Sequence, residues 1–176
     1  MAGRTAAPSA WIERFADRVP AGGRVLDLAC GGGRHARLFL HRGHPVTLVD
    51  RDLSGVSDLG GRGDVETLDA DLEDGGPFPL AGRSFAGVVV TNYLHRPLLP
   101  AMVQAVAPGG VLLYETFAQG NEAFGKPSNP AFLLAPGELL EAVRGALRVR
   151  AYEELVVDAP RPAAVQRLCA ERPRSA

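Results

Sequence analysis

Residues 31–33 are three consecutive glycines, and they join a short apolar run to a segment with helical character. Residues 25–29 predict a buried strand, and residues 34–42 predict a helix that Gly43 ends. Glycine at such a junction lets the backbone turn tightly and lets a ligand approach without a Cβ in the way. A buried strand that passes through glycines into a helix constrains the chain to an alternating α/β arrangement.

The rest of the chain repeats this alternation. Further strands are expected at 45–50, 65–69, 85–91 and 111–117, and helices at 8–19, 98–106 and 136–146. The last third predicts two strands, 147–157 and 164–170, which pair antiparallel because no crossover helix separates them. The pattern predicts a doubly wound, mostly parallel seven-stranded sheet with an antiparallel C-terminal strand.

Composition narrows the function classes. The 176 residues, 46% of them hydrophobic and 22% charged, predict a single folded domain over 1–176. A net charge of -1 lacks the basic surplus of a duplex-binding domain, so we expect no nucleic-acid partner. We also expect no membrane partner and a cytoplasmic location, because no apolar run has spanning length and the start has no hydrophobic signal core. Two cysteines outside any CxxC pair predict neither a metal site nor a disulfide framework.

Two acids lie near the carboxyl ends of the expected strands 25–29 and 45–50, where a bound ligand could contact them. Asp50 ends the second strand, 50 − 31 = 19 residues after Gly31, where a carboxylate suits the two hydroxyls of a ribose. Asp27, near the end of the first strand, suits an ammonium group. A dinucleotide site would carry Gly-x-Gly-x-x-Gly, but Ala29 replaces the first glycine and Arg34 the last. The residues therefore favour an aminoacyl nucleoside over a dinucleotide.

At this point the chain resembles the class I S-adenosylmethionine-dependent methyltransferases, from about residue 20 to its end. VLDLACGGGR resembles the first motif of that family, LVDRD the second, DADLED the third, PFPLAGRSFAGVVVTNYLH the fourth, and APGGVLLYETF the fifth strand with its preceding turn. The family often has Gly at position 29 and Asp at position 86, and both are Ala here. Compact size and the stretch ETFAQGNEAFG are similar to small bacterial members of the tellurite-resistance type and other small-molecule methyltransferases.

The resemblance implies a Rossmann-like fold, S-adenosyl-L-methionine as cofactor and a set of binding residues. The methionine moiety would contact Asp27, Ala29, Gly31 and Gly33, the ribose Asp50, and the adenine Asp71 and Leu72, with Cys30, Arg51 and Asn92 completing the cofactor site. Within the single domain we expect an N-terminal helix at 8–19 and a cofactor core at 24–117. A loop on the substrate side at 118–135 and a C-terminal helix with a strand pair at 136–170 complete it.

Candidate catalytic residues are His95, Tyr93 and Glu115. Tyr93 and His95 follow the fourth strand, where open α/β sheets bind ligands, and an imidazole titrates near neutrality as a general base must. Glu115 ends an otherwise apolar strand, where an acid is costly unless it is paired or faces a cavity. The alternative interpretations are a polar loop residue for His95 and a structural acid for Glu115.

We expect a small-molecule acceptor, because the chain has almost no insertions beyond its sheet, and a monomer or weak homodimer. Three alternatives stay open: a non-catalytic cofactor-binding or scaffold protein, a nicotinamide-dependent oxidoreductase, and a methyltransferase of protein or nucleic acid. The sequence has no Tyr-x-x-x-Lys motif, which counts against the oxidoreductase. TNYLH stands in place of the Asn-Pro-Pro-Tyr-type motif of many amine-directed enzymes, which counts against a protein or nucleic-acid acceptor.

Overall fold

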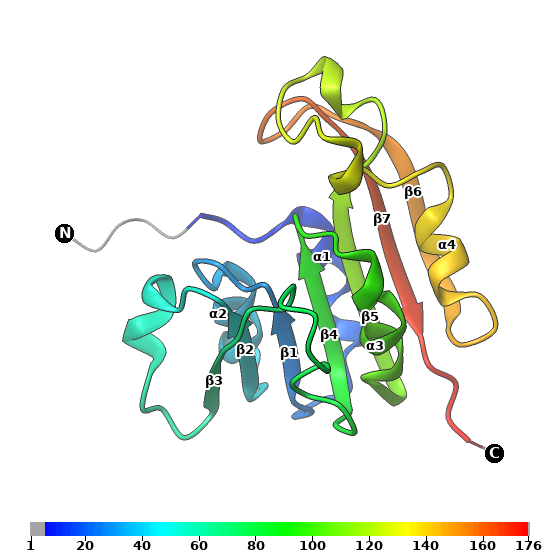
Figure 1. Ribbon diagram of the computed structural model, residues 1–176. Coiled ribbons are helices and arrows are strands. Elements are labelled where there is room, and N and C mark those ends of the chain that lie inside the picture. Colours follow the sequence, from blue (N-terminus) through cyan, green and yellow to red (C-terminus); the bar gives the residue numbers. More distant parts are fainter. Residues whose placement is uncertain (1–5, 176) are drawn as a thin grey trace.

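One seven-stranded sheet organises the computed structural model, which describes residues 6–175 (Figure 1). The strand order is β3-β2-β1-β4-β5-β7-β6. Neighbours among the first five strands run parallel, whereas β7 runs antiparallel to both β5 and β6. The strands are β1 (Val25–Leu28), β2 (Val46–Asp50), β3 (Val65–Asp69), β4 (Phe85–Thr91), β5 (Val106–Phe117), β6 (Arg148–Val157) and β7 (Ala163–Glu171). The predicted doubly wound fold with an antiparallel C-terminal strand is confirmed.

Four short helices cover the two faces of this sheet. Figure 1 shows α1 and α2 behind it and α3 and α4 in front. The α-helices are α1 (Ala10–Phe15), α2 (Arg34–His41), α3 (Leu99–Gln104) and α4 (Glu138–Val143). Single 3-10 turns connect other parts of the chain: η1 (Ala16–Arg18), η2 (Ser54–Leu59), η3 (Arg96–Leu98), η4 (Asn121–Ala123) and η5 (Pro130–Phe132).

Alternation along the central strands builds two cores. Leu26, Leu28 and Val88 are fully buried on the side of α3 and α4. Val25 and Val89 are equally buried on the side of α1 and α2. Central parallel strands are covered on both faces, so their apolar character is continuous, as the sequence of β4 shows.

The helices are shorter than their sequence patterns predict, and β5 is longer. The predicted strand 111–117 instead starts at Val106. The chain leaves α3 at Ala105, whose carbonyl accepts a hydrogen bond from the Phe85 amide at 2.7 Å and so joins the sheet early. A β-bulge between Phe85 and Gly87 takes up the extra residues. Gly110 is required there, because a Cβ at this position would lie 2.9 Å from the backbone oxygens of Phe85, Ala86 and Ala107.

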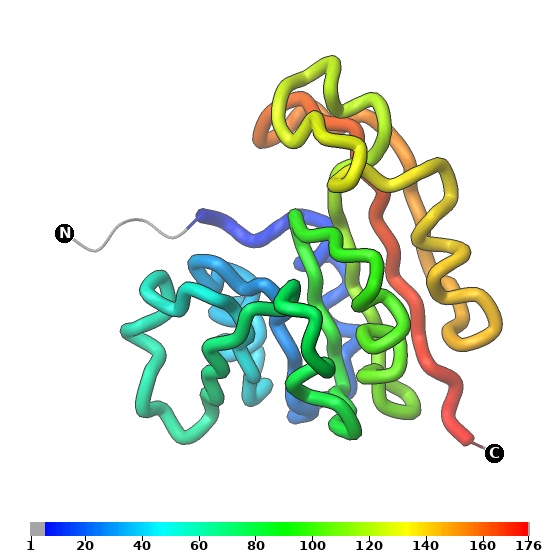
Figure 2. Tube along the Cα trace, in the orientation of Figure 1, coloured from blue at the N-terminus to red at the C-terminus, as the bar shows by residue number. Residues whose placement is uncertain are grey.

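The cover loop, residues 118–135, passes beyond the carboxyl ends of the parallel strands. The tube in Figure 2 shows it beside the turn that joins β6 and β7. Arg161 of that turn donates a hydrogen bond to the Lys126 carbonyl at 3.0 Å. Buried Asn121 links the loop to β7, because its side chain donates to the Pro127 carbonyl and accepts from the Ala164 amide. The loop therefore has a defined course despite its irregular backbone.

Within residues 6–175, no helix combines the length and the apolar character that crossing a bilayer would take.

Candidate functional site

A cavity of about 620 Å³ lies at the carboxyl ends of the parallel strands. The sheet order reverses between β1 and β4, and open α/β sheets bind ligands in the crevice at such a point. The cavity is lined by Ala29, Asp50, Arg51, Ala70, Asp71, Leu72, Glu73, Asn92, Tyr93, Leu94, Thr116, Phe117, Pro127 and Phe132. Its volume lies within the range of roughly 300–1,000 Å³ that is usual for small-molecule sites.

The glycine turn, residues 29–33, joins β1 to α2 beside this cavity, and Ala29 is its member in the lining. Ala29, Gly31 and Gly33 all adopt positive φ, at 55°, 51° and 70°. A Cβ at Gly33 would lie 2.5 Å from the Val56 side chain, so this position requires glycine on steric grounds as well. At Gly31 a Cβ would meet nothing within 4 Å, so the backbone there is open to a ligand.

Asp50 connects the glycine turn to the loop after β2. Its Oδ2 accepts a hydrogen bond from the Gly31 amide at 2.8 Å, and its Oδ1 accepts one from the Asp52 amide at 3.1 Å. The carboxylate is thereby held at the cavity wall, and carboxylate oxygens have lone pairs to spare for further donors.

Asp27 lies below the turn and is not among the cavity-lining residues. It is 3% exposed, and its Oδ2 accepts a hydrogen bond from the Ala36 amide at 3.1 Å. Burial raises the pKa of Asp27 to about 7, and nearby Arg34 opposes that shift. A buried acid with a pKa near neutrality is common at functional sites, because a cation that approaches it is strongly favoured.

Cys30, Gly31 and Gly33 also belong to the turn without lining the cavity. Burial raises the pKa of the Cys30 thiol to about 12, so this cysteine stays protonated. The other residues predicted to bind a cofactor all line the cavity, namely Ala29, Asp50, Arg51, Asp71, Leu72 and Asn92.

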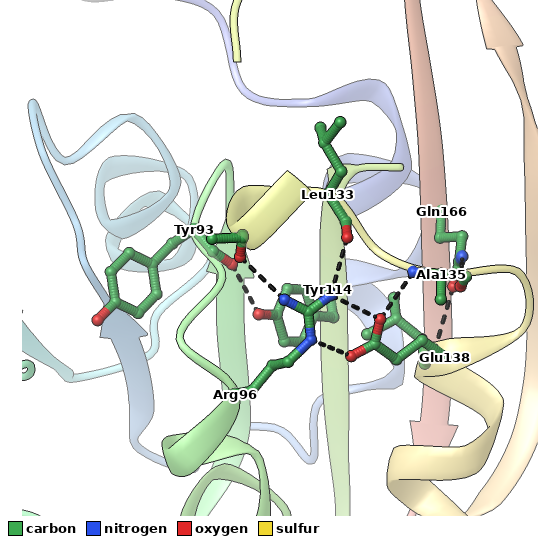
Figure 3. A network of polar contacts seen from close by, with 9 residues as sticks. Tyr93, Arg96, Tyr114, Leu133, Ala135, Glu138 and Gln166 are labelled. Atoms are coloured by element: carbon green, nitrogen blue, oxygen red, sulfur yellow. Dashed lines mark hydrogen bonds and ion pairs between the residues drawn. The ribbon is translucent and has the colours of Figure 1, made fainter. Parts of the chain in front are cut away.

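Tyr93 lines the cavity and has a buried hydroxyl without a hydrogen-bond partner. Burial raises its pKa, and the carboxylates of Glu73 and Asp71 act in the same direction. In Figure 3 the Tyr93 side chain points away from Arg96, while its carbonyl accepts a 2.6 Å hydrogen bond from the Tyr114 hydroxyl. The hydroxyl makes no hydrogen bond of normal geometry, but the Glu73 carboxylate lies close enough to act on it as an acceptor.

Glu115 faces the opposite side of the sheet from the cavity. Its carboxylate accepts a 2.7 Å hydrogen bond from the Ser9 hydroxyl and forms a 3.3 Å ion pair with Arg167. Successive residues of a strand point to opposite faces, and Thr116 is the neighbour that lines the cavity. The geometry thus agrees with a structural, paired acid at position 115.

His95 is not among the cavity-lining residues either. It precedes η3, where its carbonyl accepts a hydrogen bond from the Leu98 amide at 2.9 Å. Of the three candidate catalytic residues, only Tyr93 contributes to the cavity.

Part of the cavity wall was not anticipated from the sequence: Ala70, Glu73, Leu94, Thr116, Phe117, Pro127 and Phe132. Strand ends are a signal that could have pointed to Leu94 and Thr116, because β4 and β5 end next to them. No local signal marks Pro127 and Phe132, because the path of the cover loop decides their positions.

Arg96 fixes that path. Its guanidinium donates hydrogen bonds to the carbonyls of Ala131 and Leu133 at 2.9 and 2.8 Å and pairs with Glu138 at 2.6 Å (Figure 3). Glu138 in turn accepts a 2.7 Å hydrogen bond from the Ala135 amide. This cluster, the Arg96 clasp, holds the end of the cover loop against the η3 turn and α4.

Chemically, the site offers carboxylates for hydroxyl and amine groups on one side and apolar side chains on the other. Among residues 6–175, no three His, Cys, Asp or Glu side chains come together in a way that would hold a metal ion.

Comparisons with known proteins place this geometry in a fold family. No family model matches the sequence, and no curated protein matches it. TehB from Haemophilus influenzae has a similar structure, with a TM-score of 0.71 and 18% identity over 91% of this chain. The match covers 61% of TehB, so this chain spans less than two thirds of that protein.

Two further solved structures have the same fold. An S-adenosylmethionine-dependent methyltransferase from Mesorhizobium loti matches with a TM-score of 0.71 and 20% identity over 93% of this chain and 98% of its own. The Burkholderia thailandensis 1,6-didemethyltoxoflavin-N1-methyltransferase was solved with 1,6-didemethyltoxoflavin and S-adenosylhomocysteine. It matches with a TM-score of 0.65 and 18% identity over 93% of this chain and 75% of its own. The chain therefore has the Rossmann-like fold found in S-adenosylmethionine-dependent methyltransferases.

Proposed function

We propose that this protein is an S-adenosylmethionine-dependent methyltransferase with a small-molecule acceptor. The observation that carries the proposal is the joint placement of the glycine turn and Asp50 at the β1–β4 switch point, where a 2.8 Å hydrogen bond connects them beside the cavity. The fold agrees, because the M. loti and B. thailandensis proteins are named as methyltransferases. Fold alone does not decide function, so the proposal depends on the site.

The residues present fit an aminoacyl nucleoside. Asp50 would accept hydrogen bonds from the ribose hydroxyls, and the open backbone at Gly31 would lie against the methionine moiety. Asp27 would compensate the charge of the ammonium group, and Asp71 with the Leu72 amide would contact the adenine. The Tyr93 ring lines the same cavity, with its hydroxyl beside the Glu73 carboxylate.

When bound, the cofactor would supply an electrophilic methyl group on a sulfonium. The protein's part in such a displacement is to align the two reactants and to exclude water. Pro127 and Phe132 of the cover loop and Tyr93 form part of the cavity wall at the strand ends, and Ala29 of the glycine turn lines it as well. This role does not require a catalytic dyad.

The test is isothermal titration of the protein with S-adenosylhomocysteine, and with NADH and NADPH in parallel. We expect binding of the sulfur nucleoside alone. Asp50→Ala should weaken it by roughly 1–3 kcal/mol, because charge-assisted hydrogen bonds are lost. The matched control is Asp64→Ala, which removes the same charge from the end of β3 remote from the cavity.

Unchanged affinity in Asp50→Ala would contradict the role of Asp50. Binding of a nicotinamide cofactor instead would favour the oxidoreductase, and no binding of any nucleotide would favour a scaffold protein.

A further inference from the structure

Charge is distributed unequally around the cavity. The charged side chains of its lining are Asp50, Arg51, Asp71 and Glu73, and all follow β2 or β3. The opposite part of the wall, which we call the acceptor half, comes from the ends of β4 and β5 and from the cover loop. It consists of Tyr93, Leu94, Thr116, Phe117, Pro127 and Phe132. Asn92 also follows β4 and lines the cavity, but it belongs to the expected cofactor site and is not counted here.

The acceptor half is apolar and aromatic. Three of its six residues carry aromatic rings, and its polar side-chain atoms are the hydroxyls of Tyr93 and Thr116. Phe132 is 47% exposed even though it is a large hydrophobic residue. An exposed aromatic side chain at the wall of a cavity is typical of a ligand contact, because binding would remove its apolar surface from water.

Two charged groups close to the acceptor half in the sequence, Arg96 and Glu115, are already paired. Arg96 directs its guanidinium to the Ala131 and Leu133 carbonyls and to Glu138. Glu115 lies on the other face of the sheet and is bound by Ser9 and Arg167. Of the residues that the structure describes, those of the acceptor half carry no charged side chain. Glu73 of the neighbouring wall acts on the Tyr93 hydroxyl, and three carboxylates with the Arg51 guanidinium set the charge of the whole lining.

We propose that the acceptor is an uncharged, planar aromatic or heteroaromatic molecule. This inference rests on the proposed function. An oxyanion or carboxylate in the acceptor half would face a lining with three carboxylates and one guanidinium, and burying a charge in such surroundings is costly. A flat ring between Phe132, Phe117 and Tyr93 gains apolar contact and offset or edge contacts between rings.

The chemistry of such an acceptor balances without further groups. A neutral nitrogen lone pair forms the bond to the methyl carbon as the carbon–sulfur bond breaks, and the electron pair of that bond stays on sulfur. The positive charge passes from the sulfonium to the acceptor. An acceptor that carries a proton on the nitrogen then releases it to water.

The test compares matched ligands. Quinoline and indole, with quinoline-4-carboxylate and indole-3-carboxylate as charged counterparts, are titrated into the protein with and without S-adenosylhomocysteine. We expect each uncharged compound to bind at least about tenfold more tightly than its carboxylate. Equal or tighter binding of the carboxylates, or no binding of either uncharged compound at millimolar concentration, would overturn the proposal.

Two phenylalanines of the cover loop give a matched pair of variants. Phe132→Ala should weaken quinoline binding roughly tenfold, through loss of ring contacts. Phe124→Ala should leave it unchanged, because Phe124 is similarly exposed, at 44%, but does not line the cavity. Equal effects of the two variants would count against the proposal.

The two proposals fail separately. S-adenosylhomocysteine affinity is measured in the same samples, and it should be the same in both phenylalanine variants. If the unmodified protein does not bind S-adenosylhomocysteine, the methyltransferase proposal is contradicted. The comparison of uncharged with charged ring compounds tests the proposed acceptor class.

Discussion

Asp27 shows at the scale of one residue how stability and function oppose each other in this fold. The carboxyl is buried beside the glycine turn, where a single backbone amide satisfies it. Its pKa is raised from 3.8 to about 7, so the folded protein holds a proton that the unfolded chain releases. A carboxyl with a raised pKa in the folded state contributes stability fully below its unfolded pKa of 3.8, and this contribution is lost as pH rises to the folded pKa of about 7.

We therefore expect a pH-dependent effect of Asp27→Asn. Between pH 3.8 and about 7, the free energy of unfolding of the wild type should fall relative to the variant, by up to about 1.4 kcal/mol per pH unit. Above pH 7 the difference should stay constant, because the carboxyl is ionised in both states. Urea unfolding at pH 5, 6, 7 and 8 measures this difference without ligand. A constant difference over that range would show that the pKa of Asp27 is not raised.

The same variant should lose affinity for S-adenosylhomocysteine, because an amide cannot compensate the charge of an ammonium group. A gain in stability at pH 8 together with weaker binding would identify Asp27 as a residue kept for its ligand.

Site residues were predictable where they lie at the carboxyl end of a strand. Asp50 ends β2, Asp71 and Asn92 follow within two residues of β3 and β4, and all three line the cavity, although their contacts with a ligand stay predictions. Phe132 was not predictable, because contacts such as Arg96 with Leu133, 37 positions apart, decide where it lies. Sequence spacing carries no information on such a contact.

At the scale of elements, strands were easier to predict than helices. The prediction for β3 matches its bounds, and that for β2 is one residue too long. Helix α4 instead covers only Glu138–Val143 of the predicted 136–146. Gly137 adopts a φ of 70° and Arg144 has an extended ψ of 129°, so the backbone departs from helical geometry at both ends. Apolar periodicity reports which face is buried, but it does not report where the backbone leaves the helix.

The Arg96 clasp is the element-scale contact that is most open to test. Arg96→Ala would leave two carbonyls of the cover loop without their donor and Glu138 without its guanidinium, which costs roughly 1–3 kcal/mol locally. We expect faster hydrogen exchange of residues 129–135 and weaker quinoline binding. Arg144→Ala is the control, because the Arg144–Glu141 pair is 73% and 63% exposed and such pairs contribute little. Unchanged exchange in Arg96→Ala would show that other contacts hold the loop.

At the scale of the whole molecule, α1 joins the start of the chain to its end. Trp11 is 2% exposed, and its indole Nε1 donates a 3.1 Å hydrogen bond to the Leu168 carbonyl of β7. The Phe15 ring packs edge-on against the indole, with 4.6 Å between the ring centroids. The Arg167 Cζ lies 5.2 Å from the centroid of the indole ring. The sheet is therefore covered on this face by a helix from the opposite end of the sequence.

This arrangement predicts that Trp11→Ala destabilises the domain as a unit. Removing a buried tryptophan costs about 3–5 kcal/mol, and the loss should lower the urea midpoint of the single unfolding transition followed by far-UV circular dichroism. Val149→Ala on β6 is the control, because its side chain is 40% exposed and the change should stay within about 0.5 kcal/mol. If Trp11→Ala instead produced a separate early transition, with the main midpoint unchanged, α1 would be an appendage. In that case β7 would be held in the sheet by its pairing with β5 and β6, without a contribution from α1.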